Sequence, residues 1–167
     1  MRIGLISDTH SHLDPKVFDY FEECDEIWHA GDIGSGVLQP LQDFKPVRAV
    51  YGNIDDKEIT SACPEHQKFK CEKLNVWITH IGGYPPRYNP HMRPLLQADP
   101  PDIFICGHSH ILKVMRDPKL NNLIFINPGA AGIQGFHKIK TIMRFDIEGK
   151  QVKNMQAIEL GKKGKIQ

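Results

Sequence analysis

Seven side chains that can offer a nitrogen or oxygen atom to a metal ion stand at the ends of strands that the sequence predicts. They are Asp8, His10, Asp32, Asn53, His80, His108 and His110. None is a thiolate, and such donors suit manganese, iron, zinc or nickel better than a structural zinc site of cysteines. Seven donors exceed what one ion with open positions needs. We therefore expect two divalent ions that share a carboxylate, an arrangement that can clamp phosphoryl oxygens and supply a hydroxide for in-line attack.

The first two candidates follow a short apolar run at the N-terminus. Ile3, Leu5 and Ile6 predict a buried strand that ends in a polar loop. If strand geometry continues through Asp8, a period of two places Asp8 and His10 on one face. An aspartate after a strand is more often a turn or helix-cap residue, so this pair alone is weak evidence for a metal site.

Alternating strands and helices in the first third of the chain position three of the candidates. The sequence predicts strands at 3–6, 26–30 and 46–51, with helices at 15–24 and 37–44. This alternation is typical of parallel strands with right-handed crossovers, and ligands of such sheets bind beyond the carboxyl ends of the strands. Asp8, Asp32 and Asn53 each follow one of these ends, so we expect them in one crevice. His29 lies inside a predicted strand and is expected to be packed, not to bind metal.

The remainder of the chain is richer in strands. We expect a hairpin of two strands at 66–71 and 75–80, an irregular loop at 81–89 and a helix at 90–98. Five further strands are expected at 102–106, 111–115, 123–126, 139–147 and 151–158. The strand count predicts an α/β fold in which two packed sheets form a sandwich flanked by helices. Residues 1–160 are expected to form a single domain, and residues 161–167 a frayed basic tail.

Composition narrows the class of protein. The 167 residues include 21 Lys and Arg against 20 Asp and Glu, a formal net charge of +1. This balance argues against non-specific binding to nucleic acid or to an anionic membrane. No apolar run approaches the roughly 18 residues of a membrane helix, and the N-terminus does not resemble a signal peptide. We therefore expect a cytoplasmic protein whose four cysteines are reduced thiols.

Five short motifs resemble, in order and spacing, those of the calcineurin-like metallophosphoesterases, most closely the small single-domain phosphodiesterase branch. They are Asp8-Thr9-His10, Gly31-Asp32, Gly52-Asn53, His80 and Gly107-His108-Ser109-His110. The resemblance extends from Met1 to about Ile147, and five motifs in register are specific where any one is not. It implies the family's four-layer metallophosphoesterase fold, a two-sheet sandwich with outer helices. It also implies that Asn127-Pro128-Gly129 forms a loop near the site.

The resemblance further implies a role for each candidate. The family pattern gives the first metal Asp8, His10 and His110, gives the second Asn53, His80 and His108, and makes Asp32 the bridge. Asn53, His10 and Asp32 are also expected to act in catalysis. The implied cofactors are two divalent ions, manganese first, with iron, zinc or nickel as alternatives. The implied substrate is a small phosphoester, and homo-oligomerisation is left open.

One position departs from the pattern of the larger family members. Those proteins carry a histidine after Gly-Asn that acts as a general acid or contacts phosphate, whereas this chain has Ile54 there, followed by Asp55. The small branch often lacks that histidine too. Isoleucine cannot donate a proton, which puts efficient expulsion of a poor leaving group in doubt. Asp55 and His12 are the other groups considered as donors.

Two further functions compete with the phosphodiesterase. The first is a non-catalytic metal-binding scaffold like the sorting subunit of the retromer coat, which resembles this family but has lost some metal ligands. All seven positions are intact here, which favours the enzyme. The second is a DNA nuclease, which is the weaker alternative because nucleases of this family carry extra domains and this chain has no basic excess.

Overall fold

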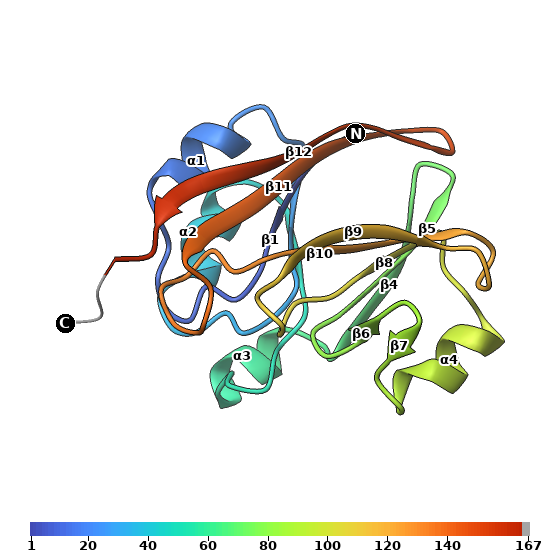
Figure 1. Ribbon diagram of the computed structural model, residues 1–167. Helices are drawn as coiled ribbons and strands as arrows, with labels where there is room; N and C mark the ends of the chain where they lie inside the picture. The colour runs from blue at the N-terminus through green and yellow to red at the C-terminus, as the bar shows by residue number, and fades with distance from the viewer. Residues whose placement is uncertain (165–167) are drawn as a thin grey trace.

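The computed structural model describes residues 1–164 as two five-stranded sheets that lie face to face, with helices on the outside (Figure 1). The first sheet consists of Arg2–Ile6 (β1), Glu26–His29 (β2), Val47–Ala49 (β3), Ile139–Glu148 (β11) and Gln151–Lys162 (β12). Its strand order is β12-β11-β1-β2-β3. The strands β1, β2 and β3 run parallel, and β11 pairs antiparallel with β1.

The second sheet consists of His66–Cys71 (β4), Leu74–Thr79 (β5), Ile103–Ile105 (β8), Leu112–Asp117 (β9) and Leu123–Pro128 (β10). Its order is β4-β5-β8-β10-β9, and β5, β8 and β10 run parallel. Between β5 and β8 lies a small hairpin of Gly83–Tyr84 (β6) and Arg87–Tyr88 (β7). The carboxyl ends of β1, β2 and β3 in the first sheet, and of β5 and β8 in the second, lead into the segments that carry the candidate ligands.

Buried apolar side chains join the layers. Between the sheets, the rings of Trp28 and Phe145 meet edge to face with centroids 5.9 Å apart. Phe21 packs within the cluster outside the first sheet, and Leu96 within the cluster outside the second. The helices are Lys16–Phe21 (α1), Leu38–Phe44 (α2), Lys57–Ala62 (α3) and Met92–Ala98 (α4). Burial of this apolar surface is the main contribution to the stability of the packed sheets that carry the ligand loops.

The predicted fold class is confirmed, as are the parallel order of the first three strands and the hairpin of β4 with β5. Helix α3 was not predicted. Only Ile59 of α3 is buried, so the segment lacks an apolar stripe, although Asp56 Oδ1 caps it by accepting from Ile59 N at 3.2 Å. Strand β12 continues to Lys162, two residues into the expected tail, and the end of that tail, 165–167, lies outside the described residues.

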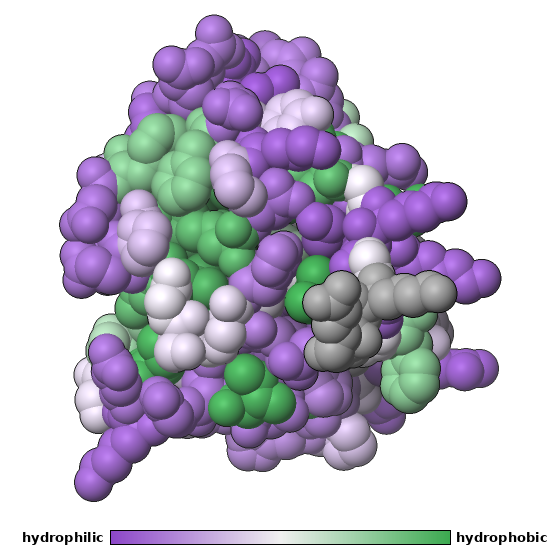
Figure 2. Space-filling view, turned by 90° about the vertical axis from the view of Figure 1, so that its left-hand side faces the viewer, coloured by the Kyte–Doolittle hydropathy of each residue, from purple (hydrophilic) through white to green (hydrophobic). Residues whose placement is uncertain are grey.

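Figure 2 shows the face that lies at the left of Figure 1, where hydrophilic side chains surround a smaller group of hydrophobic ones. The exposed apolar side chains of the molecule include Ile54 and Ile81, which are 46% and 39% exposed. Within residues 1–164, no helix is both long enough and apolar enough to cross a membrane.

Candidate metal centre

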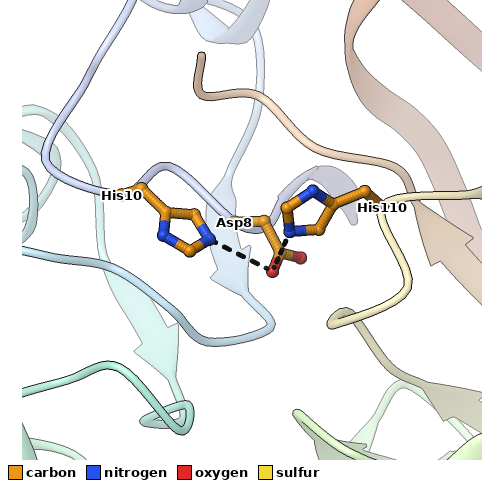
Figure 3. Close-up of side chains that lie close together, drawn as sticks. All are labelled: Asp8, His10 and His110. Atoms are coloured by element: carbon orange, nitrogen blue, oxygen red, sulfur yellow. Dashed lines mark ion pairs between the residues drawn. The ribbon is translucent and has the colours of Figure 1, made fainter. Parts of the chain in front are cut away.

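The first group of candidate ligands consists of Asp8, His10 and His110, which come from the loops after β1 and β8. Their side chains point toward one another, and their donor atoms lie within 4.8 Å of one another (Figure 3). Asp8 Oδ1 lies 3.1 Å from His110 Nε2 and 3.8 Å from His10 Nε2. This spacing is short enough for one ion to contact all three.

The second group consists of Asp32, His80 and His108, whose donor atoms also lie within 4.8 Å of one another. Asn53 adjoins them, because its Oδ1 lies 3.1 Å from His80 Nε2 and 3.0 Å from His108 Nδ1. Asp32 Oδ2 lies 3.1 Å from His80 Nε2 and 3.5 Å from His10 Nε2 of the first group. The structure thus brings all seven candidates together and places the Asp32 carboxylate between the groups.

Hydrogen bonds between two loops, not strand geometry, make Asp8 and His10 converge. Strand β1 ends at Ile6, so the expectation that strand geometry continues through Asp8 is wrong. Asp8 and His10 have left-handed backbones, with φ of 52° and 46°. Their N–H groups donate to the carbonyls of Gly31 and Asp32, each at 3.0 Å. Such unfavourable backbones persist where surrounding contacts determine them, as these inter-loop bonds do.

Two glycines allow the loops to approach the carboxylates closely. A Cβ on Gly52 would lie 2.1 Å from Asp32 Oδ1, and one on Gly107 would lie 2.6 Å from Asp8 Oδ2. Any larger residue would displace these oxygens. The glycines of the Gly-Asn and Gly-His motifs are therefore needed because no side chain fits at these two positions.

A backbone carbonyl fixes the tautomer of His80. The Nδ1 atom lies 2.7 Å from the carbonyl oxygen of Ala30, which can only accept a hydrogen bond. Nδ1 therefore carries a proton, and Nε2, which lies 3.1 Å from Asp32 Oδ2, is the ring nitrogen that can bind a metal ion once its own proton is released. Carbonyl partners of this kind orient metal-binding histidines in many proteins.

The Asp8 carboxylate is buried, with one oxygen fully paired. Oδ2 accepts from Ser7 Oγ at 2.6 Å and from the backbone N–H of His108 at 3.1 Å. Burial alone would raise the pKa of Asp8, but the neighbouring His10 and His110 hold it below its usual value. Asp8 is therefore ionised at neutral pH and leaves Oδ1 directed at the two histidines.

The site residues fit divalent cations. Asp8 Oδ1 and His10 Nε2 are buried, yet neither has a hydrogen-bond partner among residues 1–164. Burial alone would raise the pKa of Asp32, but the hydrogen bond to His80 lowers it below its usual value. Two buried carboxylates therefore share a small space in ionised form. Buried charges and unpaired polar atoms are costly unless compensated, and divalent ions would compensate both.

His29 is fully buried, and its ring connects the loop after β1 to the loop after β2. The N–H of Gly31 donates to its Nδ1 at 3.2 Å, so the neutral ring carries its proton on Nε2. Nε2 donates to Thr9 Oγ1 at 3.1 Å, and Thr9 Oγ1 donates to the carbonyl of Ile33 at 2.7 Å. Burial lowers the pKa of His29 to about 4, which keeps the ring neutral.

The stability that His29 contributes is expected to fall as the pH falls from about 6.5 to 4. In the unfolded chain the ring has its ordinary pKa near 6.5 and gains a proton in this range, whereas the folded ring, with a pKa of about 4, stays largely neutral. The unfolded state then binds more protons, so the contribution of His29 to the free energy of unfolding decreases by about 3 kcal/mol between pH 7 and pH 4.

Because other histidines of the site titrate in the same range, the measured quantity is a difference between two proteins. Urea unfolding of metal-free wild type and of His29→Gln, whose amide does not titrate, gives this difference at each pH. A difference that stays constant from pH 7 to pH 4 would contradict a buried neutral His29.

Asp55 has a structural role that the sequence did not reveal. Its carboxylate accepts from the backbone N–H groups of Ile33, Gly34 and Gly52, at 3.1, 2.8 and 2.8 Å. It thereby ties the loop after β2 to the loop after β3. With both oxygens engaged as acceptors, Asp55 is not placed to donate a proton to a leaving group.

Asn127 is a second residue whose contacts the sequence did not reveal. Its Nδ2 donates to the carbonyl of Gly107 at 2.9 Å and to Ser109 Oγ at 3.1 Å, which supports the loop that carries His108 and His110. Asn127 and Pro128 end strand β10, where a loop was expected. Only comparison with the family, not a local pattern, singled out this segment.

The chain matches a known protein family over most of its length. Residues 1–150 match the family model of the calcineurin-like phosphoesterase superfamily domain. A probable metallophosphoesterase of Methanothermobacter thermautotrophicus is 33% identical over 136 residues, which are 78% of this chain and 77% of that protein.

Two solved structures show the same fold. A novel archaeal phosphodiesterase has a TM-score of 0.76 at 23% identity, with 96% of this chain and 100% of that chain covered. Vps29 of Entamoeba histolytica, complexed with Zn²⁺, has a TM-score of 0.71 at 19% identity, with 95% and 99% covered. Since the family model matches most of its length, the chain belongs to the calcineurin-like phosphoesterase superfamily.

Proposed function

We propose that this protein is a phosphodiesterase that hydrolyses small phosphoesters with two divalent metal ions, manganese first, with iron, zinc or nickel as alternatives. The observation that carries the proposal is that two buried metal-donor atoms, Asp8 Oδ1 and His10 Nε2, have no hydrogen-bond partner among residues 1–164. Membership of the superfamily supplies the class of phosphoester hydrolases. The likeness of the fold to an archaeal phosphodiesterase supports diesters as the substrate.

In this proposal Asp8, His10 and His110 would hold the first ion, Asn53, His80 and His108 would hold the second, and Asp32 would contribute to both. Divalent ions at such a centre supply a hydroxide near neutral pH and polarise phosphoryl oxygens. The chain itself keeps both carboxylates ionised and fixes the donor atoms. The carbonyl of Ala30 engages Nδ1 of His80 and so leaves Nε2 as the nitrogen that can bind an ion.

Chelation is expected to abolish hydrolysis of bis(4-nitrophenyl) phosphate, and Mn²⁺ should restore it at least about tenfold better than Mg²⁺. The reason is that Mg²⁺ prefers oxygen ligands and water, whereas four of the seven proposed donors are imidazoles. Initial rates at saturating concentrations of each ion measure the difference. Equal restoration by the two ions would contradict a centre rich in histidine.

The monoester 4-nitrophenyl phosphate, which has the same leaving group, is the matched control substrate. A higher kcat/KM for the diester is expected. The opposite order would leave the class of phosphoesterases in place and overturn the preference for diesters.

A scaffold without catalytic activity is the second candidate function, because Vps29 has the same fold. The two candidates differ in one measurable respect. A protein that binds two ions yet hydrolyses neither nitrophenyl substrate would favour the scaffold.

A further inference from the structure

A cavity of ≈ 220 Å³ opens beside the metal centre, and nothing in the proposed chemistry uses it. Asn53 and His80, two of the proposed metal ligands, form part of its wall. The loop before Asn53, strand β4 and the start of α4 supply most of the remainder. A cavity of this size next to the ligands can hold a group esterified to a phosphate at the centre.

The wall of this cavity, among the described residues, holds a carboxylate and no lysine or arginine that could pair with a second anionic group. Glu65 contributes the carboxylate. Trp77 Nε1 donates to His66 Nδ1 at 3.3 Å, and burial lowers the pKa of His66, so this ring is uncharged at pH 7. A negative charge in the cavity would be repelled by the Glu65 carboxylate, with no lysine or arginine in the wall to offset the repulsion.

The same wall suits a flat apolar group. Tyr51 and His66, whose side chains end in rings, line the cavity, as does Ile81, which is 39% exposed. The ring of His66 is held edge to face against Trp77, with centroids 5.8 Å apart. Rings in fixed positions favour aromatic partners through stacking and edge contacts.

We propose that this cavity binds an uncharged aromatic ester group of the substrate and discriminates against an ester group with a second negative charge. The proposal rests on the proposed phosphodiesterase function for the bond that is broken. It adds the chemical class of the group attached to the phosphate.

Two symmetric substrates test the charge preference. Bis(4-nitrophenyl) phosphate and bis(4-carboxyphenyl) phosphate have ester groups of similar shape, so either ester position presents the same charge to the cavity. The kcat/KM for the nitrophenyl diester divided by that for the carboxyphenyl diester should fall about tenfold in Glu65→Lys and by less in Glu65→Gln. Lysine reverses the charge at this position, which removes the repulsion and adds an attraction, whereas glutamine only removes the repulsion. Dividing by the wild-type ratio cancels the difference between the leaving groups.

Glu148→Lys is the matched control. The side chains of Glu148 and Glu65 are 63% and 60% exposed, and Glu148 lies at the end of β11, outside the cavity. The substrate ratio should be unchanged in this variant. An equal change in Glu65→Lys and Glu148→Lys, or no change in Glu65→Lys, would overturn the proposal.

A binding measurement separates failure of the cavity from failure of the proposed function. In NMR spectra of the wild type, 4-nitrobenzyl alcohol should shift the amide signals of Tyr51 and Ile81, whereas anionic 4-carboxybenzyl alcohol should not. If these shifts occur and neither diester is hydrolysed, the cavity stands and the phosphodiesterase function fails. If both diesters are hydrolysed and the neutral alcohol shifts neither signal, the cavity proposal fails alone.

Discussion

Replacing Asp32 with asparagine should reduce turnover of bis(4-nitrophenyl) phosphate by at least about 10³-fold. Asp32 Oδ2 lies 3.1 Å from His80 Nε2 and 3.5 Å from His10 Nε2, so it adjoins both groups of donors. Asparagine has the same shape but removes the negative charge that two ions would share. Its side-chain oxygen can still accept from Ile54 N, as Asp32 Oδ1 does at 3.0 Å, so the loop should keep its conformation.

Metal analysis by mass spectrometry on the purified variants distinguishes the roles of the two carboxylates. Asp32→Asn should weaken binding of both ions, whereas Asp8→Asn should mainly weaken binding of the first. Asp43→Asn is the control, because Asp43 is exposed and, within residues 1–164, its side chain accepts only from Gln39 Nε2. Two retained ions and a near-normal rate in Asp32→Asn would show that the carboxylate does not bridge the ions.

The positions of Asp32 and Asn53 could be inferred from the sequence because they depend on a general property of parallel sheets. Strands β1, β2 and β3 are parallel neighbours, so the residues after them meet at one edge. The pattern of buried strands gave this order without knowledge of any side-chain contact.

The convergence of Asp8 with His10 was predicted for the wrong reason. Local periodicity assumes an extended backbone, whereas both residues are left-handed because their N–H groups bond to the loop after β2. Bonds between segments distant in sequence leave no periodic signal. For the same reason, Asp55 was named from the sequence only as an acid, although it connects two loops.

The second large effect concerns the leaving group, because the residue after Asn53 cannot act as an acid. Ile54 is 46% exposed, and its backbone N–H contacts Asp32 Oδ1, so a side chain here lies beside the metal centre. The carboxylate of the adjacent Asp55 accepts three backbone N–H groups and is not available as a donor. A positioned acid typically accelerates such a reaction by ~10²–10⁴-fold. The wild-type rate should therefore depend steeply on the acidity of the leaving group.

A series of aryl phosphodiesters with graded leaving-group pKa values measures this dependence. In Ile54→His the slope should be shallower, and the rate for the poorest leaving group should rise at least about tenfold, because an imidazole can protonate the departing oxygen. Ile54→Gln, which is polar but cannot act as an acid at neutral pH, should retain the wild-type slope, and the metal content of all three proteins must be equal. A flat dependence in the wild type would show that another group already donates the proton. His12, whose Nε2 is buried without a hydrogen-bond partner among residues 1–164, would then be the residue to replace.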